Sequence, residues 1–191
     1  VMTSPHHQSG TDRVAEVVRN LECDIVVNIQ GDEPLIPPEN IDLVIEPLLA
    51  RDDLSVSTLM IAIHKSSEML DPDICKVVVD NEGCALYFTR APIPYNRDFD
   101  YIEETYSDPK INSKEWILGF KHIGIYAYKK SFLPQFINMK VSKLENSEKL
   151  EQLRILENRY LIQLVETKQN SIGVDRPEDI DKVIKAMNGK N

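Results

Sequence analysis

The chain has 191 residues, of which 42% are hydrophobic and 28% charged, and its formal net charge is −9 at pH 7. This length suits one globular domain, or one domain with a small lobe, and no run of residues approaches the roughly 18 apolar positions of a membrane span. The acidic balance argues against a general nucleic-acid-binding surface, which needs clustered lysine and arginine, although a nucleotide can still bind where metal ions neutralise its phosphates. Cys23, Cys75 and Cys84 have no CxxC spacing, which argues against a zinc site and predicts reduced core thiols in a cytosol.

The first third of the chain alternates the hydrophobic periods of helices and strands. Apolar residues three and four positions apart indicate helices, whereas a short apolar run such as DIVVNIQ is typical of a strand covered on both faces. Ser9 or Thr11 is expected to cap the first helix, and Pro47 to kink or end the second. In chain order, the pattern predicts a helix over 11–21, a strand over 24–30, a helix over 37–49 and a strand over 54–63.

The rest of the chain adds a hairpin and further strands and helices. Ile123, Ile125 and Ala127 alternate with polar or aromatic neighbours, which is the pattern of a half-buried strand over 120–130, and the polar residues 96–113 are expected to form a mobile loop. The remaining predictions are a β-hairpin over 75–90, helices over 131–137 and 142–159, a strand over 161–167 and a helix over 176–187. This order indicates a three-layer α/β sandwich with some antiparallel strands, in which ligands bind beyond the carboxyl ends of the strands.

Two aspartates stand where such a ligand site is expected. Asp32 directly follows the strand over 24–30, and Asp175 lies between the last predicted strand and the last helix. Magnesium usually takes one or two protein carboxylates, with phosphates and water in its other positions, so aspartates at adjacent strand ends suit it. The spacing alone leaves plainer alternatives open: Asp32 and Glu33 as turn residues, and Asp175 as a helix cap together with Glu178.

Six blocks of sequence carry a resemblance that single residues do not. They are HQSGTDR, VNIQGDEPLIP, ALYFTRAPIPYNRD, KHIGIYAY, LEQLR and GVDRPEDID, in this order. Together they resemble the 3-deoxy-manno-octulosonate cytidylyltransferase (CMP-Kdo synthetase) family over essentially the whole chain. The resemblance implies an α/β/α sandwich of the nucleotide-diphospho-sugar transferase type, with a mostly parallel central sheet and an added antiparallel hairpin region. It also implies an enzyme that joins CTP and the sugar acid Kdo into CMP-Kdo and pyrophosphate for lipopolysaccharide synthesis, with Mg²⁺, as a cytoplasmic homodimer.

The resemblance assigns a role to each matching residue. Asp32 and Asp175 match the family's catalytic and metal-binding aspartates. The positions that match its sugar-acid-binding residues are Gln30, Arg97, His122, Tyr126, Glu151 and Gln152, and those that match its nucleotide-binding block are His7, Ser9, Gly10 and Thr11. Without the resemblance, Arg97 suits a solvated loop, and His122 and Tyr126 suit a polar sheet face. The Glu-Gln pair, Glu151 and Gln152, suits the solvated side of a helix. Arg90 suits either an ion pair at the edge of the core or a substrate contact.

Two departures from the family pattern affect what is expected of the chain. Ser4 stands where many members have an arginine, which puts one nucleotide contact in doubt. The family also opens with a loop resembling PARxxSxRLPGKPL, which holds the CTP phosphates, and nothing in these residues matches it. We therefore expect residues 1–191 to form a single nucleotidyltransferase domain that is incomplete at its N-terminus, with a sugar-binding and dimerisation lobe over 75–130.

Two rival interpretations remain open at this stage. One is a cytidylyltransferase for another sugar acid, such as a sialic acid or an amino variant of Kdo, because pocket residues rather than the fold decide the substrate. The other is a non-catalytic fragment that serves as a dimerisation or sugar-binding module.

Overall fold

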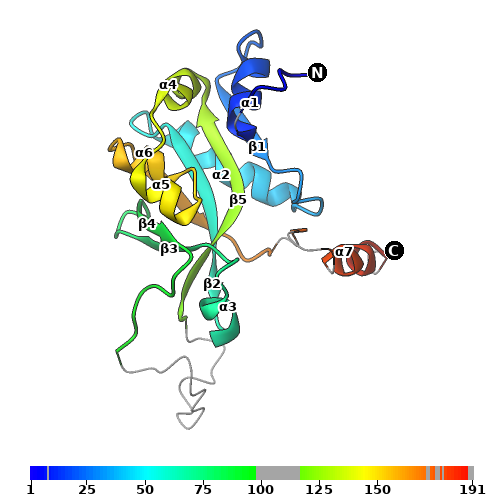
Figure 1. Cartoon of the computed structure of the whole chain (residues 1–191), viewed down its shortest axis with the longest axis vertical. Coiled ribbons are helices and arrows are strands. Elements are labelled where there is room, and N and C mark those ends of the chain that lie inside the picture. The colour runs from blue at the N-terminus through cyan, green and yellow to red at the C-terminus, as the bar shows by residue number, and fades with distance from the viewer. Residues whose placement is uncertain (8, 98–116, 171–172, 175–176, 178, 189–191) are drawn as a thin grey trace.

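The computed structural model describes residues 1–7, 9–97, 117–170, 173–174, 177 and 179–188 (Figure 1). Within them the helices are α1 Gly10–Val18, α2 Pro38–Ala50, α3 Ser66–Leu70, the 3₁₀ turn η1 Lys130–Phe132, α4 Leu133–Asn138, α5 Lys143–Glu148, α6 Leu153–Glu157 and α7 Asp179–Asn188. The strands are β1 Ile25–Ile29, β2 Val56–Ile63, β3 Lys76–Val79, β4 Ala85–Thr89, β5 Gly119–Lys129 and β6 Ile162–Glu166. No described helix is long and apolar enough to cross a membrane.

All six described strands belong to one sheet, which is built around β5. The strand order is β4-β3-β5-β2-β6, and β1 also pairs with β5. The expected α/β class and the antiparallel hairpin β3–β4 are confirmed. The expectation of a mostly parallel sheet is wrong for the described strands, because only β2 and β6 run parallel. The reason is β5, which enters the centre of the sheet after the hairpin and runs antiparallel to β1, β2 and β3.

Two strands share the same edge of β5, and this arrangement creates a gap. β1 pairs with the second half of β5, from Ile125 to Lys129, whereas β3 pairs with only two residues near its start, Phe120 and Lys121. β2 runs along the other edge of β5 for nearly its whole length. The backbone of Ile123 and Gly124 therefore pairs with neither β1 nor β3, and His122 N–H donates to the Cys75 carbonyl just before β3 at 2.9 Å. Side chains from the ends of both strands converge there.

Helices cover both faces of the sheet, and each face has a core of its own. On one face, Val44 and Leu48 of α2 pack on Leu59, Ile125 and Ala127. On the other face, α1, α4 and α6 pack on the strand residues Val56, Tyr126 and Tyr128, and Phe132 of η1 and Phe136 of α4 belong to the same cluster. Each buried side chain of this size stabilises the fold by roughly 1.5–3 kcal/mol. The three layers are confirmed, but the expected half-buried strand is wrong, since the second half of β5 is buried on both faces.

One helix prediction fails, and Pro47 does not end the second helix. The expected helix over 142–159 is split into α5 and α6, because Lys149 adopts a left-handed conformation with φ of 57°. α2 continues three residues beyond Pro47, and the carbonyl of Pro47 still accepts a 3.0 Å hydrogen bond from Arg51 N–H. A proline so close to a helix end removes only one hydrogen bond, and the buried Leu48 keeps the last turn on the sheet.

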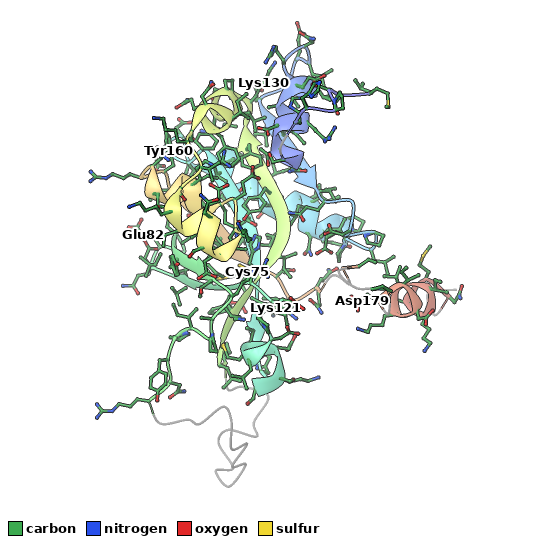
Figure 2. All side chains as sticks on the ribbon, in the orientation of Figure 1. Cys75, Glu82, Lys121, Lys130, Tyr160 and Asp179 are labelled. Carbon is green, nitrogen blue, oxygen red and sulfur yellow. The ribbon has the colours of Figure 1, made fainter. Side chains whose placement is uncertain are left out.

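The helix caps and cysteines also bear on the sequence predictions. Ser9 caps α1 as expected: its hydroxyl accepts from Asp12 N–H while the Asp12 carboxylate accepts from Ser9 N–H. The prediction of core thiols holds for Cys84, which is buried, and fails for Cys23, which is exposed. Cys75 is half-buried where the hairpin meets β5, close to Lys121 (Figure 2).

Candidate active site

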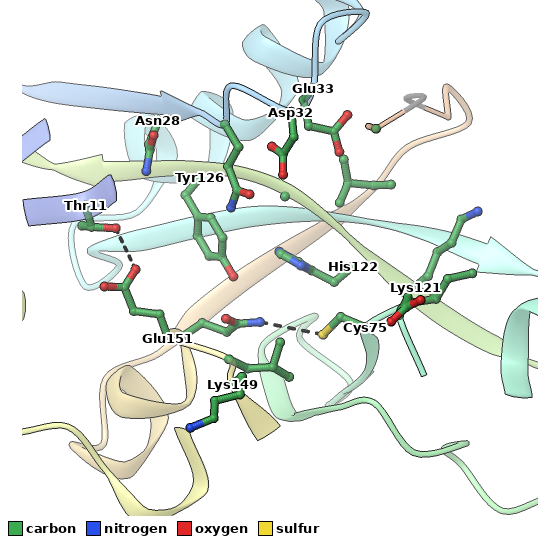
Figure 3. A pocket seen from close by; sticks show the side chains of 18 of the residues that line it. Thr11, Asn28, Asp32, Glu33, Cys75, Lys121, His122, Tyr126, Lys149 and Glu151 are labelled. Carbon is green, nitrogen blue, oxygen red and sulfur yellow. Dashed lines mark hydrogen bonds between the residues drawn. The ribbon is translucent and has the colours of Figure 1, made fainter. Parts of the chain in front are cut away.

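A cavity of about 430 Å³ opens at the gap between β1 and β3 (Figure 3). Its lining comes from the end of β1, the middle of β5, the segment before β3 and the linker between α5 and α6. An open groove of about 560 Å³ adjoins it and shares Thr11, Asn28, Gln30, Asp32 and Glu151 with the cavity. Because they share these residues, the two hollows form one continuous polar depression. The groove is additionally lined by Gly10 at the start of α1.

The end of β1 places three polar side chains at intervals of two residues. Asn28, Gln30 and Asp32 all line the cavity, as period-two alternation along a strand requires. A backbone hydrogen bond of 3.1 Å from Glu33 N–H to the Gln30 carbonyl closes the turn that carries Asp32. The Gln30 amide lies over Gly124, where an added Cβ would come within 3.5 Å of it. Asp32 is exposed and points into the cavity (Figure 3).

The middle of β5 forms the floor of the cavity. A β-bulge interrupts the β2–β5 ladder at Thr58, and bulges of this kind re-aim side chains beside functional sites. His122 lies on this floor, with Nε2 2.8 Å from the Thr58 hydroxyl and its ring edge-on to Phe88 at 5.4 Å between centroids. Burial lowers the pKa of His122 to about 3, so the imidazole is neutral. A neutral imidazole is a hydrogen-bonding group rather than a counter-ion for a carboxylate or a phosphate.

Tyr126 completes the floor with a hydroxyl that the protein leaves unpaired. Its ring lies 5.1 Å from that of His122. Its hydroxyl lies near that of Thr58 but has no partner at hydrogen-bonding distance and angle among the described residues. Burial raises the pKa of Tyr126 well above its ordinary value, so the hydroxyl keeps its proton. Leaving a buried polar group unpaired costs about 1–3 kcal/mol, and such a group in a cavity wall indicates a ligand-binding role.

The linker between α5 and α6 forms the side opposite β1. The Glu151 carboxylate accepts a 2.8 Å hydrogen bond from the Thr11 hydroxyl, which joins the linker to α1 across 140 positions of sequence. Gln152 is buried, and its amide Nε2 donates to the sulfur of Cys75 at 3.8 Å. The left-handed Lys149 turns the chain so that both side chains face the cavity instead of solvent. The interpretation of the Glu-Gln pair as the solvated side of a helix is therefore wrong.

A hydrogen-bonded cluster at the end of β4 holds the remaining wall. The Glu148 carboxylate accepts hydrogen bonds from the Thr89 hydroxyl at 2.6 Å and from Arg90 N–H at 2.9 Å. The Arg90 side chain donates to the carbonyl oxygens of Glu148 and Pro72 at 2.9 and 3.0 Å. Lys76, which is fully buried, donates to two further carbonyls of the segment before β3. Arg90 thus lines the cavity and fixes its wall at once.

The nucleotide-binding block divides into residues that line the hollows and residues that shape the backbone. Thr11 lines both hollows and Gly10 lines the groove. Ser9 caps α1, and His7 makes a short hydrogen bond with Glu16, which lowers the pKa of that carboxylate. Arg97 is exposed and lines neither hollow, so the structure does not bring it to the other expected sugar-acid residues.

Only one of the two expected metal ligands, Asp32, belongs to the described residues. Asp175 lies outside the described residues, and the part of the chain that is described holds no group of three or more His, Cys, Asp or Glu able to bind a metal. Val174, which precedes Asp175, donates a 2.8 Å hydrogen bond from its backbone N–H to the Asp32 carbonyl. Magnesium needs only one or two protein carboxylates beside phosphates and water, and the exposed Asp32 carboxylate in a polar cavity fits such a site.

Sequence reasoning missed several residues of the lining, chief among them Asn28, Lys121 and Cys75. A signal existed for Asn28, because it precedes Gln30 by two positions and so shares its face of the strand. No such signal existed for Cys75, whose place depends on the pairing of β3 with β5.

Comparison with known proteins gives a consistent family. The family model described as Cytidylyltransferase matches residues 1–167. A 3-deoxy-manno-octulosonate cytidylyltransferase from Geotalea daltonii is 50% identical over 188 residues, which cover 97% of this chain and 72% of that protein. The enzyme of the same name from Trichlorobacter lovleyi is 46% identical over 189 residues, covering 98% of this chain and 73% of its own length.

Solved structures extend the comparison to three dimensions. A CMP:2-keto-3-deoxy-manno-octonic acid synthetase complexed with CTP superposes with a TM-score of 0.85 at 36% identity, covering all of this chain and 73% of the other. The inositol-1-phosphate CTP transferase from T. maritima is only 12% identical, with a TM-score of 0.53 over 94% of this chain and 61% of its own. This second likeness concerns the fold alone, and it agrees with the sandwich expected from the sequence.

Proposed function

Because this chain belongs to the cytidylyltransferase family, and within it to the 3-deoxy-manno-octulosonate cytidylyltransferases, we propose that it couples CTP and Kdo to give CMP-Kdo and pyrophosphate. The observation that carries this proposal is the cavity itself. An exposed carboxylate stands at the open end, beside the groove of the nucleotide-binding block, and a neutral polar floor lies at the buried end. The phosphates of a nucleotide triphosphate need their charge neutralised, whereas the hydroxyl groups of a sugar acid need uncharged hydrogen-bonding partners. The open end suits the first requirement and the buried end suits the second.

The reaction joins the anomeric oxygen of Kdo to the α-phosphorus of CTP. As this bond forms, the bond from the α-phosphorus to the bridging oxygen breaks in line, pyrophosphate leaves with the electron pair, and the anomeric hydroxyl proton passes to solvent. Transfers of this kind depend on positioning and on neutralising charge more than on covalent help from the protein. No general base is needed beyond solvent when the hydroxyl is activated at the site.

The residues of this chain divide the work of positioning. Gly10 and Thr11 in the groove would lie along the nucleotide, with the N-terminal turn of α1 behind them. His122, Tyr126 and Gln152 offer uncharged hydrogen-bonding groups to the hydroxyls of the sugar acid. Glu151 accepts from Thr11 and so links the nucleotide side of the site to the sugar side. The sugar-acid carboxylate is left for the cationic part of the lining, which includes Arg90 and Lys149.

Magnesium fits the open end of this site, with Asp32 and Asp175 as the residues that would hold it. When bound, the ion supplies charge neutralisation at the phosphates and lowers the pKa of the attacking hydroxyl. The proposal is supported by the exposed Asp32 carboxylate and by the hydrogen bond from Val174, the neighbour of Asp175, to the Asp32 backbone.

Three further properties belong to the same proposal. CMP-Kdo made here would supply lipopolysaccharide synthesis, and we propose the cytoplasm as the location because CTP is available there. We also propose a homodimer formed through the lobe over 75–130, where Leu86 on the edge strand β4 and Tyr95 are exposed. Light scattering on the purified protein tests the dimer, and Leu86→Glu should shift it toward the monomer.

A pyrophosphate-release assay tests the activity. With the protein, CTP, Kdo and magnesium, we expect pyrophosphate in stoichiometric yield with CMP-Kdo, and none when any one component is omitted. Sialic acid and amino-Kdo in place of Kdo measure the substrate preference, and faster turnover with either would replace Kdo in the proposal. Release that continues without any sugar acid would indicate simple hydrolysis of CTP and contradict the proposal.

A further inference from the structure

A buried hydroxyl beneath the cavity restricts how His122 can bind a ligand. Thr58 lies in β2 with no exposed surface, and its Oγ1 is 2.8 Å from Nε2 of His122. The same oxygen is 2.7 Å from the carbonyl oxygen of Ile125 and 3.2 Å from that of Ile123. A carbonyl can only accept a hydrogen bond, so the single hydroxyl proton of Thr58 points to one of these two carbonyls. Thr58 therefore accepts from the imidazole, and Nε2 carries the proton.

The β-bulge explains why the hydroxyl proton is held at the backbone. The β2–β5 register passes from Thr58 opposite Tyr126 to Leu59 opposite Ile123, so Gly124 and Ile125 have no residue opposite them on β2. A bulge removes backbone groups from the ladder, and a buried carbonyl without a donor is costly. The Thr58 hydroxyl supplies that donor at the bulge. Its proton is then in use, so Thr58 can only accept a hydrogen bond from His122.

We propose that Thr58 is a positioning residue that holds His122 as its Nε2–H tautomer, so that Nδ1 accepts a hydrogen bond from a hydroxyl group of the bound sugar acid. The hydrogen bond that the described residues make with the His122 ring is at Nε2, and His122 points into the cavity beside Tyr126 (Figure 3). The lowered pKa of His122 supports a neutral ring, which has one donor and one acceptor. The tautomer follows from the geometry, whereas the sugar acid as its ligand rests on the proposed function.

The tautomer has a consequence for the orientation of the ligand. An acceptor at Nδ1 attracts a hydroxyl group and repels a carboxylate, because the oxygens of an ionised carboxylate offer only lone pairs. The hydroxyl-bearing part of the sugar acid therefore lies over His122, and its carboxylate lies away from this part of the floor. The specificity for a polyhydroxylated substrate would thus originate in a side chain that the substrate never touches.

Two-bond ¹H–¹⁵N correlation spectra of protein labelled at histidine ring nitrogens test the tautomer directly. The chain has four histidines, and the signals lost in His122→Gln identify the ring of interest. We expect a protonated Nε2 and an unprotonated Nδ1 in the unliganded protein. A protonated Nδ1 in the wild type would overturn the proposal, whether or not any variant folds.

Variants of Thr58 then connect the tautomer to function. Thr58→Val removes the hydroxyl at nearly constant volume, and we expect mixed tautomers and a KM for Kdo raised about tenfold, the scale of one hydrogen bond, with the KM for CTP unchanged. Thr58→Ser restores the hydroxyl and should restore both the spectrum and the KM. A Thr58→Val protein with the wild-type spectrum and wild-type KM would also overturn the proposal.

Ser57→Ala is the matched control. Ser57 is the neighbour of Thr58 in β2, is equally buried, and donates to the carbonyl of Val44 in α2, on the other side of the sheet. Its loss should lower the melting temperature without changing the His122 spectrum or the KM for Kdo. The same change in spectrum from Ser57→Ala would reduce the role of Thr58 to general packing. A wild-type protein that shows the Nε2–H signal but forms no CMP-Kdo would refute the proposed function while supporting the tautomer.

Discussion

The open end and the floor of the cavity differ in burial, and the difference separates two kinds of chemistry. Asp32 at the open end is exposed beside the groove, where water and hydrated ions have access. His122 and Tyr126 on the floor lie against Phe88 and the second half of β5, and burial keeps both of them neutral. If the proposed function holds, charge is neutralised at the exposed end and hydroxyl groups are recognised on the more buried floor. Each of the following predictions tests one side of this division.

The largest effect is expected from Asp32→Asn at the open end. If the carboxylate holds magnesium, turnover should fall about 100-fold or more, because a bound metal ion stabilises transition-state charge by several kcal/mol. The melting temperature should change little, since the side chain is exposed. Pyrophosphate release measures the first quantity and calorimetry the second. Asp42→Asn, an exposed aspartate on α2, is the control, and equal turnover in the two variants would remove Asp32 from the chemistry.

Asp175→Asn should reduce turnover to a similar extent if Asp175 is the second metal ligand. The competing interpretation, a helix cap, predicts a different outcome, because losing a cap costs about 1 kcal/mol of stability and little activity. Turnover and melting temperature measured together separate the two. A lower melting temperature with nearly normal turnover would identify Asp175 as a cap.

Tyr126→Phe, on the floor of the cavity, should change the stability of the protein and its affinity for Kdo in different ways. Removing a buried hydroxyl that has no partner should leave the protein as stable as the wild type or more stable, by up to about 1 kcal/mol, because the unpaired group is costly. The KM for Kdo should rise about tenfold, because the ligand loses a hydrogen bond. Tyr160→Phe, which removes a hydroxyl that donates to Gln135 far from the cavity, is the control. A destabilised Tyr126→Phe protein with normal KM would assign the hydroxyl to the core.

The last prediction concerns a change of pH and not a substitution in the site. Burial lowers the pKa of His122 from 6.5 to about 3, so between these values the unfolded chain binds a proton that the folded protein does not. The stability is therefore complete above pH 6.5 and declines as the pH falls toward 3. The melting temperature of the wild type should fall more steeply below pH 6.5 than that of His122→Asn. His6→Asn, at an exposed histidine, should follow the wild type, and parallel curves for all three would contradict the effect of burial.

Local pattern was enough to predict most elements and the polar end of β1. Helical spacing located α1, residue type gave Ser9 as one of two candidate caps, and the QGDEP turn after an apolar run located Asp32 at a strand end. These features depend on residues a few positions apart, which the sequence displays directly. The position of His122 and Tyr126 on a common strand face followed from the same short-range alternation.

The rest of the site depends on contacts between distant residues. Gln152 meets Cys75 across 77 positions, and Thr11 meets Glu151 across 140. The bend that brings the linker to the cavity is a left-handed lysine, and lysine carries no signal for that conformation, unlike glycine. The central place of β5 in the sheet likewise depends on strand pairing rather than on its own composition. Family resemblance supplied several of these residues, but it also supplied Arg97, which the geometry leaves outside the cavity.

The shared edge of β5 makes the two walls of the cavity mechanically separate. One wall is attached through β1 and the turn after it, and the other through the short ladder of β3. The long β2–β5 ladder involves neither of these two strands. Insertions or deletions in 31–37 or in 71–75 would therefore widen or narrow the opening and leave the register of the central strands intact. Of these two segments, only 71–75 lies outside the lining of the groove, so changes of length there would reshape the cavity without altering the groove residues.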